Sequence, residues 1–519
     1  MANDTKMAGA SRSYLYLSMA VVPLLVVLLA RRRRSGSAMA HGGLRLPRGP
    51  WQLPVIGSLH HIAGKLPHRA MRDLARRHGP VMMLRLGEVP TLVVSSPDAA
   101  REVMKTHDAA FATRPLSTTA RAGTRGGMDI AFAPYGDRWR RLRRVAATEL
   151  LSARRVLSFR SVREEEVAST LREVAGAAAA GRPVEMHAAL AALVADSIVP
   201  AVIGGRCRDR DALLRELERS NELVTGFNLV DVWPSSRLAG RLSGAVRAIE
   251  ESVDRVFGIL DGIIQEHMEK ATAGAGAGAG AATEDFLDVL LRIHKEDGLE
   301  MDAIKFVISD VFGGGSETPK TLLEWTIAEL IRNPTVMAKA TAEVRRAFAA
   351  AGTVSEEGGA LGELRYLRLV IRESLRLHPP VPLLLPRECR VHGLQVLGYD
   401  VPRGTQVLVN AWAIGRDERC WPAPEEFRPE RFGDGEAAAG VDFRGADFEL
   451  VPFGAGRRMC PGIAFALAGL LFHFDWELAP GGGVAHPAEL DMTEVFGVTA
   501  RRKAPLLLRP ILCMPVPGV

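Results

Sequence analysis

The chain of 519 residues has little cysteine, and none of its cysteines form a paired motif. No two are separated by two residues, so the usual spacing of a structural zinc site is missing. An odd number of cysteines in a long chain also argues against a disulfide scaffold and favours a reducing compartment. The five are Cys207, Cys389, Cys420, Cys460 and Cys513.

Several motifs of nucleotide-binding and hydrolytic enzymes are also absent. The chain contains no GxGxxG fingerprint, no Walker loop, no HExxH motif and no GxSxG elbow. The alternating stretch AGAGAGAGAA at 273–282 lacks the GxGxxG spacing, and we interpret it as a flexible surface loop. If the protein performs redox chemistry, its electrons must therefore come from another protein.

The charge imbalance is small. The net charge of +6 over this length gives no argument for nucleic-acid binding. Amphipathic helical patterns dominate residues 67–476, whereas short β-like runs occur at 81–96 and after Pro386. We therefore expect a mainly α fold with a small β subdomain and no internal repeat.

A long uncharged run lies near the amino terminus. Residues 14–30 would span roughly 26 Å as a helix, close to the thickness of the hydrocarbon core. Arg31–Arg34 follow at once and should stay cytosolic as a stop-transfer signal. A cleaved signal peptide is the alternative, but such peptides carry their charge before the apolar run. The predicted division is an anchor with one transmembrane helix at 1–34, a proline-rich hinge at 35–57 and a catalytic domain at 58–519.

One cysteine lies in an unusual local sequence, FGAGRRMCPG. Gly456 and Gly462 can adopt positive φ and let the backbone approach a flat ligand closely. Arg458 adds a positive charge that lowers the pKa of a nearby thiol, and Phe453 could cover the sulfur. A buried structural cysteine is the ordinary interpretation of a lone thiol. The complete pattern instead favours a functional thiolate at Cys460.

Two helical motifs pair side chains on one face. Glu373 and Arg376 are three residues apart in RESLRLHPP, and the apolar flanks indicate a buried pair, with Arg431 as a possible third partner. Trp139 and Arg143 are four residues apart and could donate together to a carboxylate. For Glu373 and Arg376, a surface ion pair is the simpler alternative. The remaining arginines of the second segment could form a basic docking patch or a solvated face, and they are Arg138, Arg140, Arg141 and Arg144.

Three glycines interrupt a helical pattern in FGGGSETPKT. Each glycine of 313–315 costs about 1 kcal/mol against alanine in a helix. Pro319 lacks an N–H and clashes with the carbonyl of Gly315. We therefore expect a bulge that leaves a polar notch beside Glu317 and Thr318, the alternative being a harmless kink.

These segments, taken in order, resemble the cytochrome P450 family, most closely its plant microsomal A-type group. The cysteine segment meets the family pattern FxxGxRxCxG in full, and LPRGPWQLPVIG at 46–57 is similar to the family's proline hinge. The matched residues are Phe453, Gly456, Arg458, Cys460 and Gly462; Glu373, Arg376 and Arg431; Gly314, Gly315, Glu317 and Thr318; and Trp139 and Arg143.

The resemblance implies the cytochrome P450 fold and a haem b (iron protoporphyrin IX) whose iron is bound by the thiolate of Cys460. Thr318 would hydrogen-bond the oxygen at the iron, and Glu317 would help deliver protons. The implied reaction is hydroxylation with O2 as co-substrate. The haem propionates would be bound by Trp139, Arg143, Arg387 and Arg458.

The resemblance also implies partners. Electrons from NADPH would come through a separate NADPH–cytochrome P450 reductase, docked on the other arginines of the Trp139 helix. The enzyme would lie in the endoplasmic reticulum membrane with its catalytic domain in the cytosol, and would bind no nucleic acid. Its substrate would be a small apolar specialised metabolite, terpenoid-like as for similar grass enzymes. The pocket would be lined by the loop at 118–128 and by Phe312, Val381, Leu384, Phe496 and Val498.

Two departures from the family pattern open alternatives. Pro319 replaces a residue that usually carries a hydroxyl. The segment from Cys460 to Trp476 is about seven residues shorter than in relatives, or roughly 10 Å of helix. The first alternative is therefore a catalytically impaired haem protein with a shortened helix behind the haem. A haem-thiolate isomerase or dehydratase is the second, which the intact Glu317–Thr318 pair disfavours.

Overall fold

The computed structural model describes residues 43–204, 209–224, 228–274, 284–460, 467–479 and 486–518. The predicted anchor, part of the predicted hinge and Gly462 lie outside the described residues. Within the described part, one helix, Met186–Ile203, is long and apolar enough to cross a membrane. It packs against another helix, and 44% of its residues are buried inside the molecule, so we assign it to the core.

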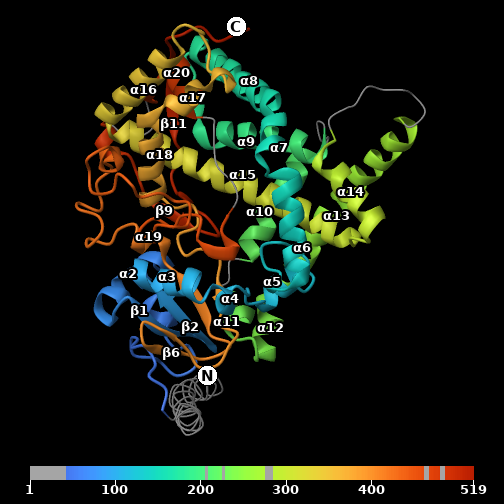
Figure 1. The fold of residues 1–519 in the computed structure, drawn as a ribbon, viewed down its shortest axis with the longest axis vertical. Helices are drawn as coiled ribbons and strands as arrows, with labels where there is room; N and C mark the ends of the chain where they lie inside the picture. Colours follow the sequence, from blue (N-terminus) through green and yellow to red (C-terminus); the bar gives the residue numbers. More distant parts are fainter. Residues whose placement is uncertain are drawn as a thin grey trace, which may run out of the picture.

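Helices form the larger part of the molecule, and the long helix α15 (Met301–Arg332) crosses its centre (Figure 1). One apolar core lies between α15 and the helices α8, α9, α16, α18 and α20. A second lies between α15 and α10, α13 and α14. The helices are α2 (Pro67–His78), α3 (Pro97–Arg101), α4 (Asp108–Phe111), α5 (Thr118–Gly123), α6 (Asp137–Val145), α7 (Ala153–Ser158), α8 (Arg160–Ala179), α9 (Met186–Ile203), α10 (Arg210–Leu223), α11 (Leu229–Val232), α12 (Arg237–Ser243), α13 (Ala245–Gly274), α14 (Phe286–Asp297), α15, α16 (Pro334–Phe348), α17 (Ala360–Glu363), α18 (Arg365–Leu377), α19 (Ala411–Ile414) and α20 (Leu467–His473).

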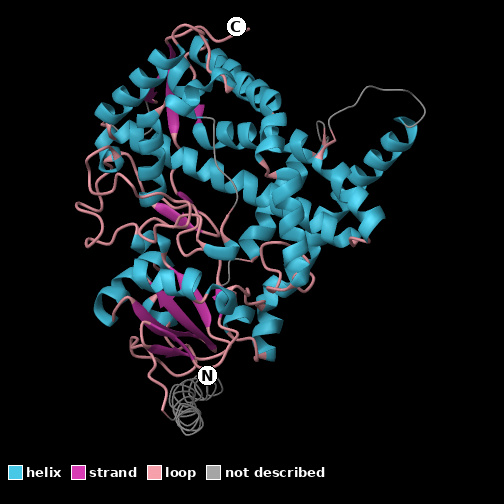
Figure 2. Cartoon of the chain, in the orientation of Figure 1, coloured by secondary structure: helices cyan, strands magenta, loops and turns pink. Residues whose placement is uncertain are grey.

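A four-stranded sheet lies at one end of the molecule (Figure 2). Its strand order is β1-β2-β7-β4, with β2 parallel to β7 and the other pairs antiparallel. The sheet therefore joins residues 81–94 to residues 387–409, and it fixes Arg387 at its edge. The remaining strands form small antiparallel groups. The strands are β1 (Val81–Leu86), β2 (Val89–Val94), β3 (Val184–Glu185), β4 (Arg387–Glu388), β5 (Leu394–Val396), β6 (Tyr399–Val401), β7 (Gln406–Val409), β8 (Phe474–Leu478), β9 (Glu494–Phe496), β10 (Ala500–Arg502) and β11 (Leu507–Leu512).

The predicted fold class, mainly α with a small β subdomain, is confirmed. The predicted bulge in α15 is wrong, because the helix runs unbroken through Pro319. Two side chains add bonds inside the helix there: Ser316 Oγ donates to the carbonyl of Phe312, and Thr318 Oγ1 donates to that of Gly314. Packing on α9 supports the same segment, where a Cβ on Gly315 would lie 3.0 Å from Ile198 Cδ1. Tertiary contacts thus outweigh the loss of one helical hydrogen bond at the proline.

The helix that follows the Cys460 segment is short. α20 has seven residues, and all of them are buried in the first core. Residues 461–466 lie outside the described part. Trp476 Nε1 on β8 donates to the carbonyl of Leu470, which ties the helix to the strand that follows it.

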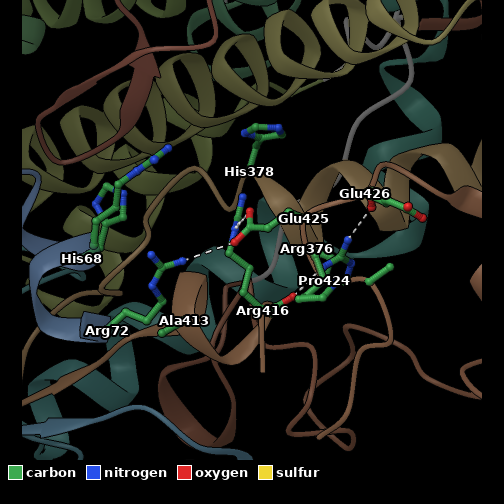
Figure 3. A network of polar contacts seen from close by, with 12 residues as sticks. His68, Arg72, Arg376, His378, Ala413, Arg416, Pro424, Glu425 and Glu426 are labelled. Carbon is green, nitrogen blue, oxygen red and sulfur yellow. Dashed lines mark hydrogen bonds and ion pairs between the residues drawn. The ribbon is translucent and has the colours of Figure 1, made fainter. Parts of the chain in front are cut away.

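The structure brings Glu373, Arg376 and Arg431 together in the interior. Two nitrogens of Arg376 donate to the Glu373 carboxylate at 2.7 and 2.8 Å, and Arg431 Nε donates to it at 2.9 Å. All three side chains are almost fully buried. The other N–H groups of Arg376 donate to the carbonyls of Gly415, Pro424 and Glu426, the last two drawn in Figure 3. This cluster fixes the long loop after α19 to α18.

Replacing Glu373 with alanine should destabilise the protein by about 3–5 kcal/mol, because two guanidinium groups would remain buried without a carboxylate. Chemical denaturation of the purified protein measures the change. The matched control is Glu251→Ala, which removes an exposed ion pair with Arg247 and should leave the midpoint unchanged. An equal effect of the two substitutions would contradict the stabilising role of the buried Glu373 cluster.

Candidate active site

Cys460 follows a short turn at Gly456–Arg458, and its side chain is exposed. Its N–H donates to the carbonyl of Phe453 at 3.1 Å, which closes the loop. Gly456 has φ +70°, and a Cβ there would lie 2.2 Å from the carbonyl oxygen of Met104. Only glycine fits this position, so the loop that presents the thiol is set by close backbone contact.

Arg458 lies deep beside the same loop. Its Nε donates to the carbonyl of Ala112 at 2.8 Å, and its Nη1 donates to that of Ile130 at 3.1 Å. The guanidinium carbon lies 4.3 Å from the centroid of the Trp139 ring. Burial, with the nearby charge of Arg387, lowers the pKa of Arg458 to about 10. Trp139 Nε1 also donates to the carbonyl of Ile130, at 3.2 Å.

Two more arginines lie close by, Arg387 buried and Arg143 half-buried. Arg387 on β4 donates to Asp108 Oδ1 at 3.4 Å and to the carbonyl of Ala455 at 3.0 Å. Arg143 on α6 donates to the carbonyl of Met459, next to Cys460. Burial lowers the pKa of both guanidinium groups. The predicted residues Trp139, Arg143, Arg387, Phe453, Gly456, Arg458 and Cys460 are thus brought together from distant parts of the chain.

Sequence reasoning missed Arg114. Its Nη1 donates to the carbonyls of Leu385 and Pro386 at 2.6 and 2.9 Å. Burial, followed by the charges of Arg387 and Arg458, lowers its pKa well below the ordinary value. An arginine placed directly after the apolar run FAT could have indicated a buried charge, but the sequence shows no partner for it.

The hydrogen-bond partners of these arginines indicate what kind of cofactor the site can bind. Arg114, Arg143 and Arg458 donate to backbone carbonyls, so their charge is incompletely neutralised by carboxylates, and buried charge of that kind is costly. A ligand that carries carboxylates would neutralise it. On α15, Gly314 is exposed, and a Cβ there would meet no atom within 4 Å, so the helix faces open space. A flat dicarboxylate group with a thiolate-ligated metal, which is a haem, fits this donor set.

The predicted catalytic pair lies on α15. Glu317 Oε2 pairs with Lys320 Nζ at 2.6 Å, and Glu317 Oε1 accepts a hydrogen bond from Thr499 Oγ1 at 2.9 Å. Burial alone would raise the pKa of Glu317, but Lys320 and Thr499 hold it below the ordinary value, so the group is a carboxylate near neutral pH. Thr318 Oγ1 donates to the carbonyl of Gly314 at 2.7 Å.

Comparison with known proteins agrees with this geometry. The family model for cytochrome P450 matches residues 47–499. The chain belongs to the cytochrome P450 family. It is 45% identical over 498 residues to zealexin A1 synthase of Zea mays, covering 94% of this chain and 96% of that protein. It is 46% identical over 516 residues to ent-isokaurene C2/C3-hydroxylase of Oryza sativa subsp. japonica, covering 96% and 98%. A solved zebrafish cytochrome P450 structure with abiraterone has a TM-score of 0.70 and 25% identity, covering 87% of this chain and 99% of that chain.

Membership makes this protein a haem-dependent P450 monooxygenase that uses O2 and takes electrons from NADPH through a reductase. When bound, the haem activates O2, and its thiolate ligand favours O–O cleavage. The protein itself has to present the thiol of Cys460, neutralise the two propionates and supply protons.

The residues predicted for the P450 substrate pocket divide into two groups. Val381 and Leu384 lie before β4, and Val498 lies in the turn between β9 and β10, where all three are partly exposed. Phe496 on β9 packs partly against the core beside α2. Phe312 on α15 is fully buried in the second core, and its place in the pocket stays a prediction.

Replacing Arg114 with leucine should lower the haem content of the purified enzyme several-fold, because one buried donor for a propionate is lost. The measurement is the haem-to-protein ratio of the isolated P450. Arg144→Leu, on the exposed side of α6, is the matched control and should retain full haem content. Equal haem content in the two variants would show that Arg114 does not serve the cofactor.

The raised pKa of Asp129 predicts that the stability of the protein depends on pH. Burial raises the pKa of this carboxyl to about 6, against the charge of Arg458, which lowers it. Because the folded pKa lies above the unfolded one, the contribution to stability is present below the unfolded pKa and is lost as the pH rises through about 6. The wild type should lose about 1 kcal/mol more than Asp129→Asn between pH 5 and pH 7.5. Denaturation of both proteins at the two pH values measures the difference, and parallel curves would contradict it.

Proposed function

We propose that the protein is a microsomal P450 that hydroxylates a small apolar terpenoid-like metabolite. The observation that carries this proposal is the set of relatives over almost the whole chain. They include enzymes named for zealexin A1, dolabradiene and ent-isokaurene, at 44–46% identity. The balanced reaction is R–H + O2 + NADPH + H⁺ → R–OH + H2O + NADP⁺.

Each chain residue has a separate task in this mechanism. Cys460 would hold the haem iron through its thiolate, Arg143, Arg387 and Arg458 would neutralise the propionates, and Trp139 would exchange its bond to the Ile130 carbonyl for one to a propionate. Glu317 and Thr318 act in proton supply. The Glu317 carboxylate holds or releases a proton at its Oε atoms, and the Thr318 hydroxyl can exchange its bond to Gly314 for one inside the site.

A polar cleft supports the role of Glu317. A cavity of about 330 Å³ lies between α9, α10 and α15, and Ser316, Glu317 and Lys320 line its inner side. Glu218 and Asn221 on α10 line it as well. Solvent can therefore reach the acid from the outer side of α15, without passing through the apolar substrate region on the other side.

Membrane association is supported by exposed apolar residues at one end of the molecule. Leu238 and Leu242 on α12 are 65% and 69% exposed, and Trp51 is 64% exposed. Trp233 Nε1 donates to the carbonyl of Val55 at 3.2 Å, so α12 and the described part of the hinge lie at the same end. This arrangement fits an interfacial surface beside an anchor at 1–34, with residues 58–519 as the catalytic domain at the endoplasmic reticulum.

A basic docking surface for the reductase would be smaller than the sequence predicts. Arg138 pairs with Glu300, Arg140 with Asp137, and Arg141 with the carbonyl of Asp297. Arg144 on α6 remains as the candidate for the contact with the NADPH–cytochrome P450 reductase, because the half-exposed Arg457 beside the cysteine loop also pairs, with Asp108.

The test combines two measurements on the full-length protein in microsomes with the reductase. The reduced, CO-treated protein should show the Soret band of a thiolate-ligated haem. A panel of sesquiterpene and diterpene hydrocarbons with NADPH should then give hydroxylated products, detected by mass spectrometry. Absence of the band would favour the impaired haem protein with the short α20, whereas the band without any terpenoid product would refute the substrate class.

Glu317→Gln should lower product formation at least tenfold while the Soret band stays unchanged, because proton supply is lost and haem binding is not. Product formed per NADPH consumed should fall in parallel. The control is Asp211→Asn, which lines the same cleft on α10. If both variants turn over like the wild type, Glu317 has no part in the reaction.

A further inference from the structure

A buried turn at residues 129–133 holds the side chains that face the haem propionates. The carbonyl of Ile130 accepts hydrogen bonds from both Trp139 Nε1 and Arg458 Nη1, at 3.2 and 3.1 Å. The carbonyl of Ala133 accepts a further bond from Arg458 Nη2. The backbone of this turn therefore orients the guanidinium group of Arg458, and it occupies the single N–H of Trp139.

A third donor uses the same turn. Arg114 Nε donates to the carbonyl of Ala131 at 3.3 Å, in addition to its bonds near β4. The turn thus lies between α6, which carries Trp139, and the loop that carries Arg114. Any shift of its backbone would move the guanidinium groups of Arg114 and Arg458 together.

Two successive N–H groups of this turn point to one side chain on α15, whereas the N–H of Phe132 donates to Asp129 Oδ2 at 3.0 Å within the turn. Asp310 Oδ2 accepts from the N–H of Ile130 at 2.6 Å and from that of Ala131 at 3.3 Å. One oxygen that accepts from two successive N–H groups fixes the direction of that peptide segment. Asp310 lies eight residues, or about two helical turns, before Thr318 on the same helix. The contact therefore links the turn to the helix that carries the catalytic pair.

We propose that Asp310 is a positioning residue of this enzyme. Its carboxyl group fixes the Ile130–Ala131 segment of the turn and, through the carbonyls of that turn, holds the guanidinium groups of Arg114 and Arg458 ready for the two propionates. The inference rests on the assignment of the haem site above. Asp310 itself touches neither cofactor nor substrate in this role.

In this role Asp310 has to provide a hydrogen-bond acceptor at the position of Oδ2. Substitutions that keep such an acceptor should therefore behave differently from those that remove it. Asparagine keeps one oxygen that can accept from both N–H groups. Serine and alanine are too short to reach the turn, and they leave two buried N–H groups without partners, which is costly. A role in orientation therefore predicts rescue by asparagine and failure of serine and alanine.

The experiment measures haem dissociation from the purified ferric enzyme to excess apomyoglobin, well below its unfolding temperature. Asp310→Ala and Asp310→Ser should release haem roughly tenfold faster than the wild type, and Asp310→Asn should remain within about threefold of it. The matched control is Asp302→Asn. Asp302 lies on α15, as Asp310 does, and it pairs with Arg125 at the surface. This substitution should leave the rate of haem dissociation unchanged.

Wild-type rates in both the alanine and serine variants would overturn the proposal, as would an asparagine variant that releases haem as fast as serine. If the alanine protein is not recovered, the serine and asparagine pair decides the matter. A purely structural role would lower the unfolding midpoint without changing haem release at the lower temperature. A failed haem assignment is recognised separately, because the wild type would then lack the thiolate Soret band.

Discussion

The site depends on buried arginine charge that the protein does not fully neutralise by itself. A guanidinium group cannot lose its proton at physiological pH, so each buried arginine needs either a carboxylate or a set of carbonyls. This enzyme uses both solutions. Arg376 and Arg431 share the carboxylate of Glu373, and their other N–H groups donate to loop carbonyls. That cluster is complete and serves the fold.

The charge of the arginines around the cysteine loop is not fully neutralised by carboxylates of the chain. Arg458 and Arg114 are held by carbonyls of residues 112–133 and 385–386, and their repulsion adds to the cost of burial. A ligand with two carboxylates removes that cost, so the folded protein and the haem are energetically coupled. Arg114 and Arg458 thus differ from Arg376 and Arg431 in donating to carbonyls where the latter share the carboxylate of Glu373.

Local sequence patterns predicted the parts of the site that are close in sequence. The cysteine loop depends on Gly456 and its neighbours, and Glu373 and Arg376 meet because they are one helical turn apart. Arg114 and Asp310 were missed, because their partners are 271 and 180 residues away in the chain. The bulge predicted in α15 failed for a related reason, since packing on α9 holds the helix straight.

The two faces of α15 would let one helix serve both tasks of the proposed mechanism, proton supply and substrate binding. Glu317 is held toward the polar cleft by Lys320 and Thr499, whereas Gly314 faces open space and Thr318 donates to its carbonyl. A proton that enters from the cleft therefore has to cross the helix between two adjacent side chains. Lys320 favours the ionised acid, so Glu317 stays ready to accept that proton from solvent. Its bond to Thr499 also joins the acid to the turn of Val498, and movement of that turn on substrate binding would reach the proton donor directly.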